Sequence, residues 1–221
     1  MEKGIREVAG QSHSRISMIM RCRKFFSRKE LLNFYKCFVL SFIEFGTPAF
    51  YHATAFALTP LDWVQNRMLE EVGLSECDAL EYYALAPLGC RRDIAMLGLL
   101  HRINNNEAPE AMSAYFFPEY RVMFPRGFRE RHLRHNRQIH DYSDGSDSRL
   151  FQRSIFGLVN TYNLLPQFVV DLKLTHTFQH HLQRALKVAA TKEGLAWKTF
   201  FTTGVRRMTV SRFHEFFQVV S

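Results

Sequence analysis

The sequence lacks the short motifs that mark the common enzyme active sites. It has no Walker phosphate loop, no H-E-x-x-H zinc motif, no G-x-S-x-G nucleophile elbow and no dinucleotide-binding glycine pattern. Its acidic residues also form no cluster of the kind that holds two Mg²⁺ ions in a polymerase. We therefore expect no catalytic residue, no cofactor and no small-molecule substrate.

Long apolar runs are missing as well. A membrane-spanning helix needs about 20 consecutive apolar residues, and charged residues and prolines interrupt the most apolar region of this chain. The opening MEKGIREVAG lacks the apolar core of a signal peptide. These features predict a soluble, intracellular protein with no membrane partner, and they do not distinguish nucleus from cytoplasm.

Cysteine is scarce, and its spacing indicates neither a disulfide framework nor a metal site. No C-x-x-C pair occurs, which favours reduced and mostly buried thiols at the four positions Cys22, Cys37, Cys77 and Cys90. Two histidine pairs have ligand-like spacing but no convincing third partner, namely His132 with His135 and His176 with His180. We therefore predict no bound metal.

Apolar and basic residues are abundant. The 221 residues are 47% hydrophobic and 14% aromatic, which is enough for a packed core. Twenty-nine Lys and Arg against 21 Asp and Glu give a net charge of +8. This charge permits binding to nucleic acid or to another anionic surface without requiring either.

Helix signals dominate the first third of the chain. Ser27 and Glu30 form an S-x-x-E capping box, which predicts a helix that runs to about Phe45 and stops at Gly46 and Pro48. A second helix is predicted from an N-cap at Thr59, with Pro60 as its first residue and Asp62 in its first turn, to a stop at Gly73.

An amphipathic helix is predicted over residues 5–26. Its apolar face contains Ile5, Ser12 and Ile16, and its basic side includes Arg21, Arg23 and Lys24. These three cations are candidate contacts to a nucleic-acid backbone. The alternative is an ordinary solvated helix face.

Several segments together resemble the region that follows the polymerase palm in LINE-type (non-LTR) retrotransposon reverse transcriptases. The resemblance spans about residues 5–186, and the usual Trp of the last motif is Tyr162 here. The matching segments are Tyr35-Lys36, Phe45-Gly46-Thr47-Pro48-Ala49-Phe50-Tyr51, Leu61-Asp62-Trp63-Val64-Gln65-Asn66-Arg67, Arg91-Arg92 with the helix that follows, Arg153-Ser154, Tyr162-Asn163-Leu164-Leu165-Pro166 and Phe178 with Leu182.

The resemblance implies a thumb and connection without the catalytic palm, which would lie upstream of Met1. It makes an upstream catalytic region of the same element a candidate partner, alongside RNA or DNA. Arg91 and Arg92 are then candidate phosphate contacts, or else they pair with the acidic stretch at 61–88.

Residues 120–140 are the most strongly basic part of the sequence. Arginine with interleaved aromatic residues can hold phosphates and stack on bases, and the alternative is a solvated linker. The candidate binding residues in this segment are Arg126, Arg129, Arg131, Arg134 and Arg137.

These patterns predict an all-α fold, an irregular multi-helix bundle with a basic irregular loop near 118–148. The expected parts are thumb-like and connection helices at 1–117, the Arg-rich loop at 118–148, a helical pair at 149–190 and a basic tail at 191–221. The tail is either one more amphipathic helix or a segment without fixed structure.

The function expected from the resemblance is that of a non-catalytic C-terminal fragment of an RNA-directed DNA polymerase that binds RNA or DNA backbone. A helical protein-interaction module and a decayed, non-functional reading frame are the alternatives.

Overall fold

The computed structural model describes the whole chain except residues 119–133, 143–147, 193 and 219–221. The described residues form helices, with one isolated bridge between Pro118 and Ile139 and no strand, so the all-α prediction is confirmed. None of the helices described has the length and apolar character needed to cross a bilayer. Much of the predicted basic loop, 118–148, lies outside the described residues.

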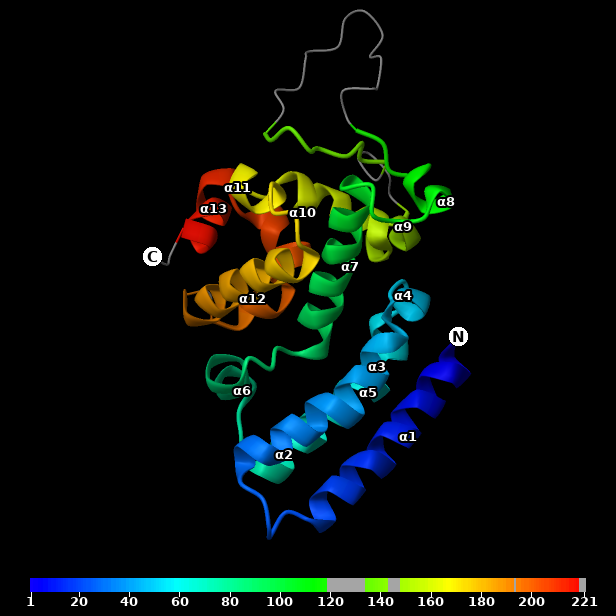
Figure 1. The fold of residues 1–221 in the computed structure, drawn as a ribbon, viewed down its shortest axis with the longest axis vertical. Coiled ribbons are helices and arrows are strands. Elements are labelled where there is room, and N and C mark those ends of the chain that lie inside the picture. The colour runs from blue at the N-terminus through cyan, green and yellow to red at the C-terminus, as the bar shows by residue number, and fades with distance from the viewer. Residues whose placement is uncertain (119–133, 143–147, 193, 219–221) are drawn as a thin grey trace, which may run out of the picture. The chain divides into compact units, whose positions relative to one another are not determined.

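The chain divides into two compact units, Met1–Arg92 and Asp93–Ser221 (Figure 1). The division falls inside one helix, whereas the sequence-based domain assignment placed its first boundary at residue 117. Helical periodicity continues through the division, so the sequence carries no local signal for it.

Unit 1 is built from helices that pack along one another. α1 lies along α5 and along the helix formed by α2, a π-helical segment and α3 (Figure 1). The last helix, α7, continues into unit 2. The elements are α1 (Glu2–Arg21), α2 (Arg28–Phe34), the π-helix (Tyr35–Leu40), α3 (Ser41–Phe45), α4 (Thr47–Phe50), α5 (Ala55–Val72), α6 (Glu76–Tyr83) and α7 (Leu88–Asn104).

The apolar face predicted for α1 forms part of the core of unit 1. Ile5, Ser12 and Ile16 are buried, and the buried Ser12 hydroxyl donates to the Val8 carbonyl at 2.7 Å. Arg15 donates to the Phe38 carbonyl in the π-helix at 2.7 Å. The Ser12 bond satisfies a buried hydroxyl within α1, whereas apolar burial and the Arg15 bond join α1 to its neighbours.

Two of the predicted helix ends are confirmed. Ser27 and Glu30 form both hydrogen bonds of the capping box. Gly73 ends α5 with a φ of 66°, the left-handed conformation that glycine adopts most readily. Both helix ends are set by residues that adjoin them in the sequence.

The predicted start of α5 is wrong. The helix begins at Ala55 with Thr54 as its N-cap, whose hydroxyl accepts from the Ala57 N–H at 3.2 Å. Pro60 therefore lies inside the helix, where its missing N–H costs one intrahelical hydrogen bond. Thr59 donates its hydroxyl to the Ala55 carbonyl instead of capping the helix.

The prediction that the cysteines are mostly buried is also wrong. All four are free thiols, but Cys22, Cys37 and Cys77 are exposed and only Cys90 is buried. Each exposed cysteine lies in a turn or on the outer side of its helix, and the apolar residues around it in the sequence supply the buried face.

Unit 2 contains the rest of α7 and a series of shorter elements. Within the predicted helical pair at 149–190, the first helical stretch is interrupted at Ser154, whose extended backbone separates α9 from a short 3-10 helix. The elements are α8 (Glu110–Ser113), α9 (Arg149–Arg153), a 3-10 helix (Ile155–Leu158), α10 (Val159–Asn163), α11 (Gln167–Val170), α12 (Thr175–Lys192), a 3-10 helix (Gly194–Thr199), a π-helix (Phe200–Gly204), a 3-10 helix (Val205–Arg207) and α13 (Val210–Gln218).

The described part of the C-terminal tail belongs to the core of unit 2. Trp197, Phe200 and Phe213 are each 1% exposed, and α13 packs against α12. The described tail residues beyond α12 form four short helical elements, whereas one alternative predicted from the sequence is a single amphipathic helix. The buried aromatic side chains explain why this segment is ordered, because removing them from water stabilises its packing on the rest of unit 2.

A buried polar chain crosses the interior of unit 2. Asn104 donates to the Tyr162 hydroxyl at 3.1 Å, and that hydroxyl lies 3.2 Å from His101 Nδ1. The His101 Nε2 atom lies 2.6 Å from the Leu172 carbonyl, and the ring stacks on Phe178 at 4.1 Å between centroids. The Asn105 amide nitrogen also lies 3.1 Å from Nε2, but the shorter contact to the Leu172 carbonyl, which can only accept, favours a proton on Nε2 and donation from Tyr162 to Nδ1.

Candidate nucleic-acid interface

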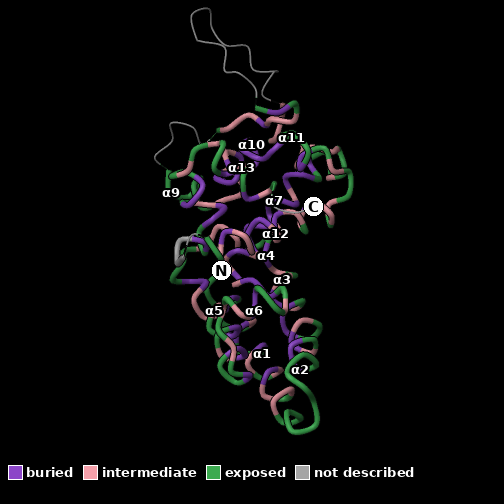
Figure 2. The backbone as a smooth tube through the Cα atoms, turned by 90° about the vertical axis from the view of Figure 1, so that its left-hand side faces the viewer, coloured by how far each residue is buried: buried purple, intermediate pink, exposed green. Residues whose placement is uncertain are grey.

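The turn between α1 and α2 lies at one end of unit 1 and is exposed throughout (Figure 2). Ser27 and Glu30 fix where α2 begins, because the Glu30 carboxylate accepts from the Ser27 backbone N–H and hydroxyl at 2.7 Å each. Both hydrogen bonds lower the pKa of Glu30, and the bond from the Ser27 hydroxyl has the larger effect. Phe26 packs edge-on against Phe34, with ring centroids 5.0 Å apart, and so anchors the turn to α2.

Five cations lie in this turn or at the helix ends beside it, and we call this surface the basic tip. No Asp or Glu occurs between residues 21 and 29. Phe25 stands among the cations with 82% of its surface exposed. The members of the basic tip are Arg21, Arg23, Lys24, Arg28 and Lys29, and all five are exposed.

Two carboxylates lie against the basic tip, Glu30 hydrogen-bonded to Ser27 and Glu71 on α5, so its five cations outnumber the anions around them. Arg23 lies 3.4 Å from Glu71 on α5, in a pair whose side chains are 60% and 32% exposed. The other four cations have no ion pair with any residue that the structure describes. Because these cations share one sign and one turn region, their potentials add, and the effect is strongest at low salt.

The structure revises how the sequence placed these cations. α1 ends at Arg21, so Arg23 and Lys24 lie in the turn and not on a helix that continues to residue 26. Arg28, Lys29 and Phe25 belong to the same surface but were not among the predicted binding residues. The unbroken run RCRKFFSRK was the signal that could have identified them.

Arg91 and Arg92 have protein partners within unit 1. Arg92 is 7% exposed and donates to both carboxylate oxygens of Asp62, at 3.0 and 3.4 Å. This pairing with the acidic stretch was the alternative considered from the sequence. Arg91 pairs with Glu44 on α3 instead. We therefore leave both arginines out of the candidate interface.

The predicted Arg-rich segment is only partly within the described residues, and Arg126, Arg129 and Arg131 fall outside them. Arg134 is exposed, and its backbone N–H donates to Gln138 at 2.8 Å. Arg137 is half-buried, donates to Asn105 and lies 3.7 Å from Asp171. These two arginines belong to unit 2, whereas the basic tip belongs to unit 1.

The described residues contain no group of three or more His, Cys, Asp or Glu side chains placed to hold a metal ion. His135 is buried, with Nε2 3.2 Å from the Tyr162 carbonyl and Nδ1 accepting from the Arg137 N–H at 3.1 Å. Its two ring nitrogens are thus used within unit 2.

Comparisons of the chain with protein-family models, with curated proteins and with solved structures give no match. The basic tip is therefore interpreted from its own charge, exposure and geometry.

Proposed function

We propose that this chain is the helical, non-catalytic C-terminal part of a LINE-type reverse transcriptase reading frame, and that it binds the backbone of RNA or DNA through the basic tip. The observation that carries the binding proposal is the set of five exposed cations, with no carboxylate among residues 21–29 and with Phe25 exposed between them. The motifs that resemble the LINE-type region support the origin.

The basic tip has the chemistry that backbone recognition requires. Lys and Arg side chains neutralise phosphates and release condensed counterions, and this supplies most of the sequence-independent affinity. An exposed aromatic ring can add stacking on an unpaired base. The turn between α1 and α2 presents the cations and the exposed ring together. The capping box fixes where α2 begins after this turn.

We expect binding to RNA and DNA duplexes to weaken steeply with salt. Changing Arg21, Lys24 and Lys29 to Ala together should lower the slope of log affinity against log salt by about 3, because each lost phosphate contact removes about one unit. Fluorescence anisotropy with a labelled duplex over a salt series measures this slope.

A matched triple variant separates the basic tip from net charge alone. Arg149, Arg206 and Arg207 are exposed in unit 2, and changing them to Ala removes the same charge. This control should keep the slope of the unmodified chain. An equal loss in both variants would contradict the assignment to the basic tip.

We also expect the purified chain to incorporate no labelled deoxynucleotide on a primed RNA template. Template-directed synthesis needs carboxylates that hold Mg²⁺, and the resemblance places those in a palm upstream of Met1. Incorporation above the no-enzyme level would refute the non-catalytic assignment, provided that its rate stays the same after a second purification.

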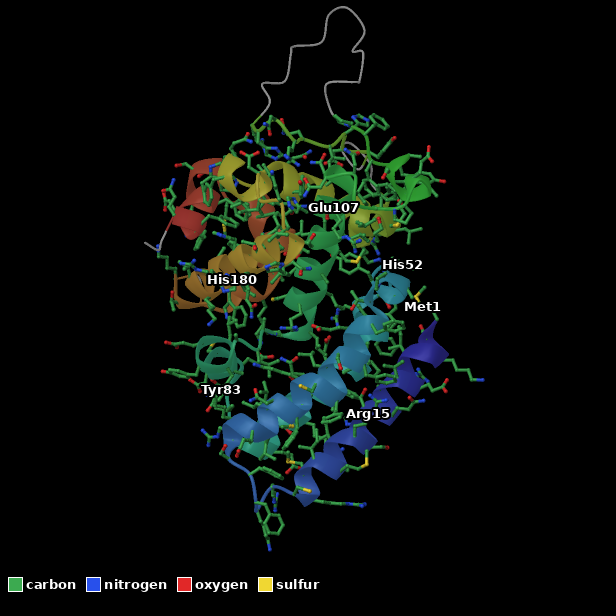
Figure 3. All side chains as sticks on the ribbon, viewed as in Figure 1. Met1, Arg15, His52, Tyr83, Glu107 and His180 are labelled. Atoms are coloured by element: carbon green, nitrogen blue, oxygen red, sulfur yellow. The ribbon has the colours of Figure 1, made fainter. Side chains whose placement is uncertain are left out.

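One observation favours a protein-interaction function as the second candidate. A mainly apolar groove of about 480 Å³ lies between α1 and the helix that begins with α2, and its lining includes Met18, Phe26 and Phe38. Met18 and Phe38 are 58% and 60% exposed. Arg15, labelled in Figure 3, also lines the groove.

The occupant that this groove fits is an amphipathic helix with acidic flanks, because the groove is apolar and the basic tip lies in the turn at its end. Binding of a synthetic Leu- and Glu-rich helical peptide, together with no binding of either nucleic acid at low salt, would favour this function over the first.

A further inference from the structure

Unit 2 contains a cavity of about 660 Å³ beside the C-terminal end of α7. Its volume is within the range of about 300–1,000 Å³ that is typical of small-molecule sites. Polar side chains and two phenylalanines line it, and these come from three separate parts of the sequence: the end of α7 with the segment after it, residues near 136, and Lys173. The sequence analysis predicted no such site.

The aromatic part of the lining is held in place by other rings. Phe116 stacks on Phe156 with centroids 5.0 Å apart and planes at 17°. Phe117 stacks on His140 at 5.2 Å and 11°, and meets the edge of Tyr142. Rings fixed in this way offer a firm apolar surface to a flat ligand, at little cost in side-chain entropy.

One side of the cavity is a fixed polar frame. Arg137 donates to Asn105, and its Nε lies 3.7 Å from Asp171. Asn104 donates to the Arg137 carbonyl at 2.7 Å. These bonds occupy the groups involved, so they define the shape of the cavity but leave little capacity to bind a ligand.

Three other lining groups remain available. Asn106, Glu107 and Lys173 have no side-chain hydrogen bond or ion pair with the residues that the structure describes. Glu107, labelled in Figure 3, follows the end of α7 and is the one carboxylate among the described lining residues. The cavity thus presents an amide, an anion and a cation around an apolar wall.

We propose that this cavity binds one nucleotide of a single strand, with guanine as the preferred base. A flat ring with hydrogen-bonding edges fits the phenylalanine wall and the amide, and the phosphate fits the Lys173 ammonium. A carboxylate accepts two N–H bonds side by side, and guanine is the base with two adjacent donors on its pairing edge. The Glu107 carboxylate therefore selects guanine.

This inference rests on the proposed function, because it takes the natural ligand to be a nucleic-acid chain and extends recognition from the backbone to a base. Free nucleotides test it separately from the basic tip. Isothermal titration of the full chain with GMP, AMP, UMP and CMP should show GMP binding most tightly. Lys173→Ala should weaken GMP binding about tenfold, as expected for a lost charge-assisted hydrogen bond.

The second variant tests base selection. Glu107→Gln should bring the affinities for GMP and AMP within about twofold of each other, because an amide cannot accept both guanine donors. Glu215→Gln and Lys187→Ala are the matched controls in unit 2, since neither residue lines the cavity, and both should bind GMP as the unmodified chain does.

The outcomes distinguish the two proposals. Duplex binding that depends on the basic tip, without measurable GMP binding, overturns the cavity proposal and leaves the proposed function standing. GMP binding unchanged by Lys173→Ala and Glu107→Gln also overturns the cavity proposal. GMP binding that Lys173→Ala weakens and whose preference over AMP Glu107→Gln removes, without any duplex binding, supports the cavity and refutes the basic tip.

Discussion

Replacing Trp197 by Ala should lower the free energy of unfolding of unit 2 by about 3–5 kcal/mol, the usual cost of deleting a large aromatic side chain from a core. Trp197 is 1% exposed and lies in the 3-10 helix that follows α12. The indole is the largest side chain buried this fully in the described part of the chain. Its loss would leave a cavity that the neighbouring helices cannot close completely. Urea titration followed by far-UV circular dichroism measures the effect.

The other tryptophan supplies the control. Trp63 is 62% exposed on α5 in unit 1, so Trp63→Ala removes the same side chain and should change stability by about 0.5 kcal/mol or less. If Trp197→Ala were as mild as Trp63→Ala, the segment after α12 would not contribute to the core of unit 2. The pair of variants therefore tests whether the C-terminal segment is an integral part of the fold.

The features that the sequence predicted well are those set by a few neighbouring residues. The Ser27 capping box and the left-handed Gly73 are local, because the groups that satisfy the helix ends lie within four residues of them. The apolar face of α1 is likewise readable from spacing alone. Such signals remain valid whatever the rest of the chain does.

The features that were missed depend on packing between distant segments. Pro60 is a good first residue for a helix, but the structure places it inside α5, where packing against α1 offsets one missing hydrogen bond. The π-helix over Tyr35–Leu40 has the same apolar spacing as an ordinary helix, so periodicity could not reveal it.

The same distinction applies to the candidate sites. The basic tip is a continuous run in the sequence, and only the position of the end of α1 was needed to identify all of it. The cavity combines Glu107, Phe116, Arg137 and Lys173, which lie far apart along the chain. No pattern in the sequence indicates that these residues meet, because the fold alone brings them together.

Unit 2 should lose stability as the pH falls below about 6.5, because it buries two neutral imidazoles. Burial is the largest cause that lowers the pKa of His101 and of His135, and the hydrogen bonds to the Leu172 and Tyr162 carbonyls oppose it. Nearby Arg137 lowers the pKa of His101 and Glu107 raises it, while Asp171 raises that of His135 and His214 and Arg134 lower it.

The direction of the pH effect follows from which state binds more protons. The unfolded chain takes up a proton at each imidazole near the ordinary pKa of 6.5, whereas the folded unit does so only at lower pH. The stabilising contributions of the two neutral imidazoles are therefore fully present above pH 6.5, the pKa of histidine in the unfolded chain. They decrease as the pH falls below it, by at most about 1.4 kcal/mol per pH unit for each imidazole.

The two tryptophans allow this loss to be measured in unit 2 alone. In a Trp63→Phe background, the fluorescence of the buried Trp197 reports unit 2, and urea titrations between pH 5 and 8 give its stability. His101→Gln removes one titrating ring. It should reduce the slope of the unfolding free energy against pH, below pH 6.5, by up to about 1.4 kcal/mol per pH unit.

His176 is exposed on α12, so the control variant His176→Gln should leave this slope unchanged. An equal slope in His101→Gln and the unmodified chain would contradict a neutral, buried His101, and with it the hydrogen-bonded chain from Asn104 through Tyr162 to Leu172.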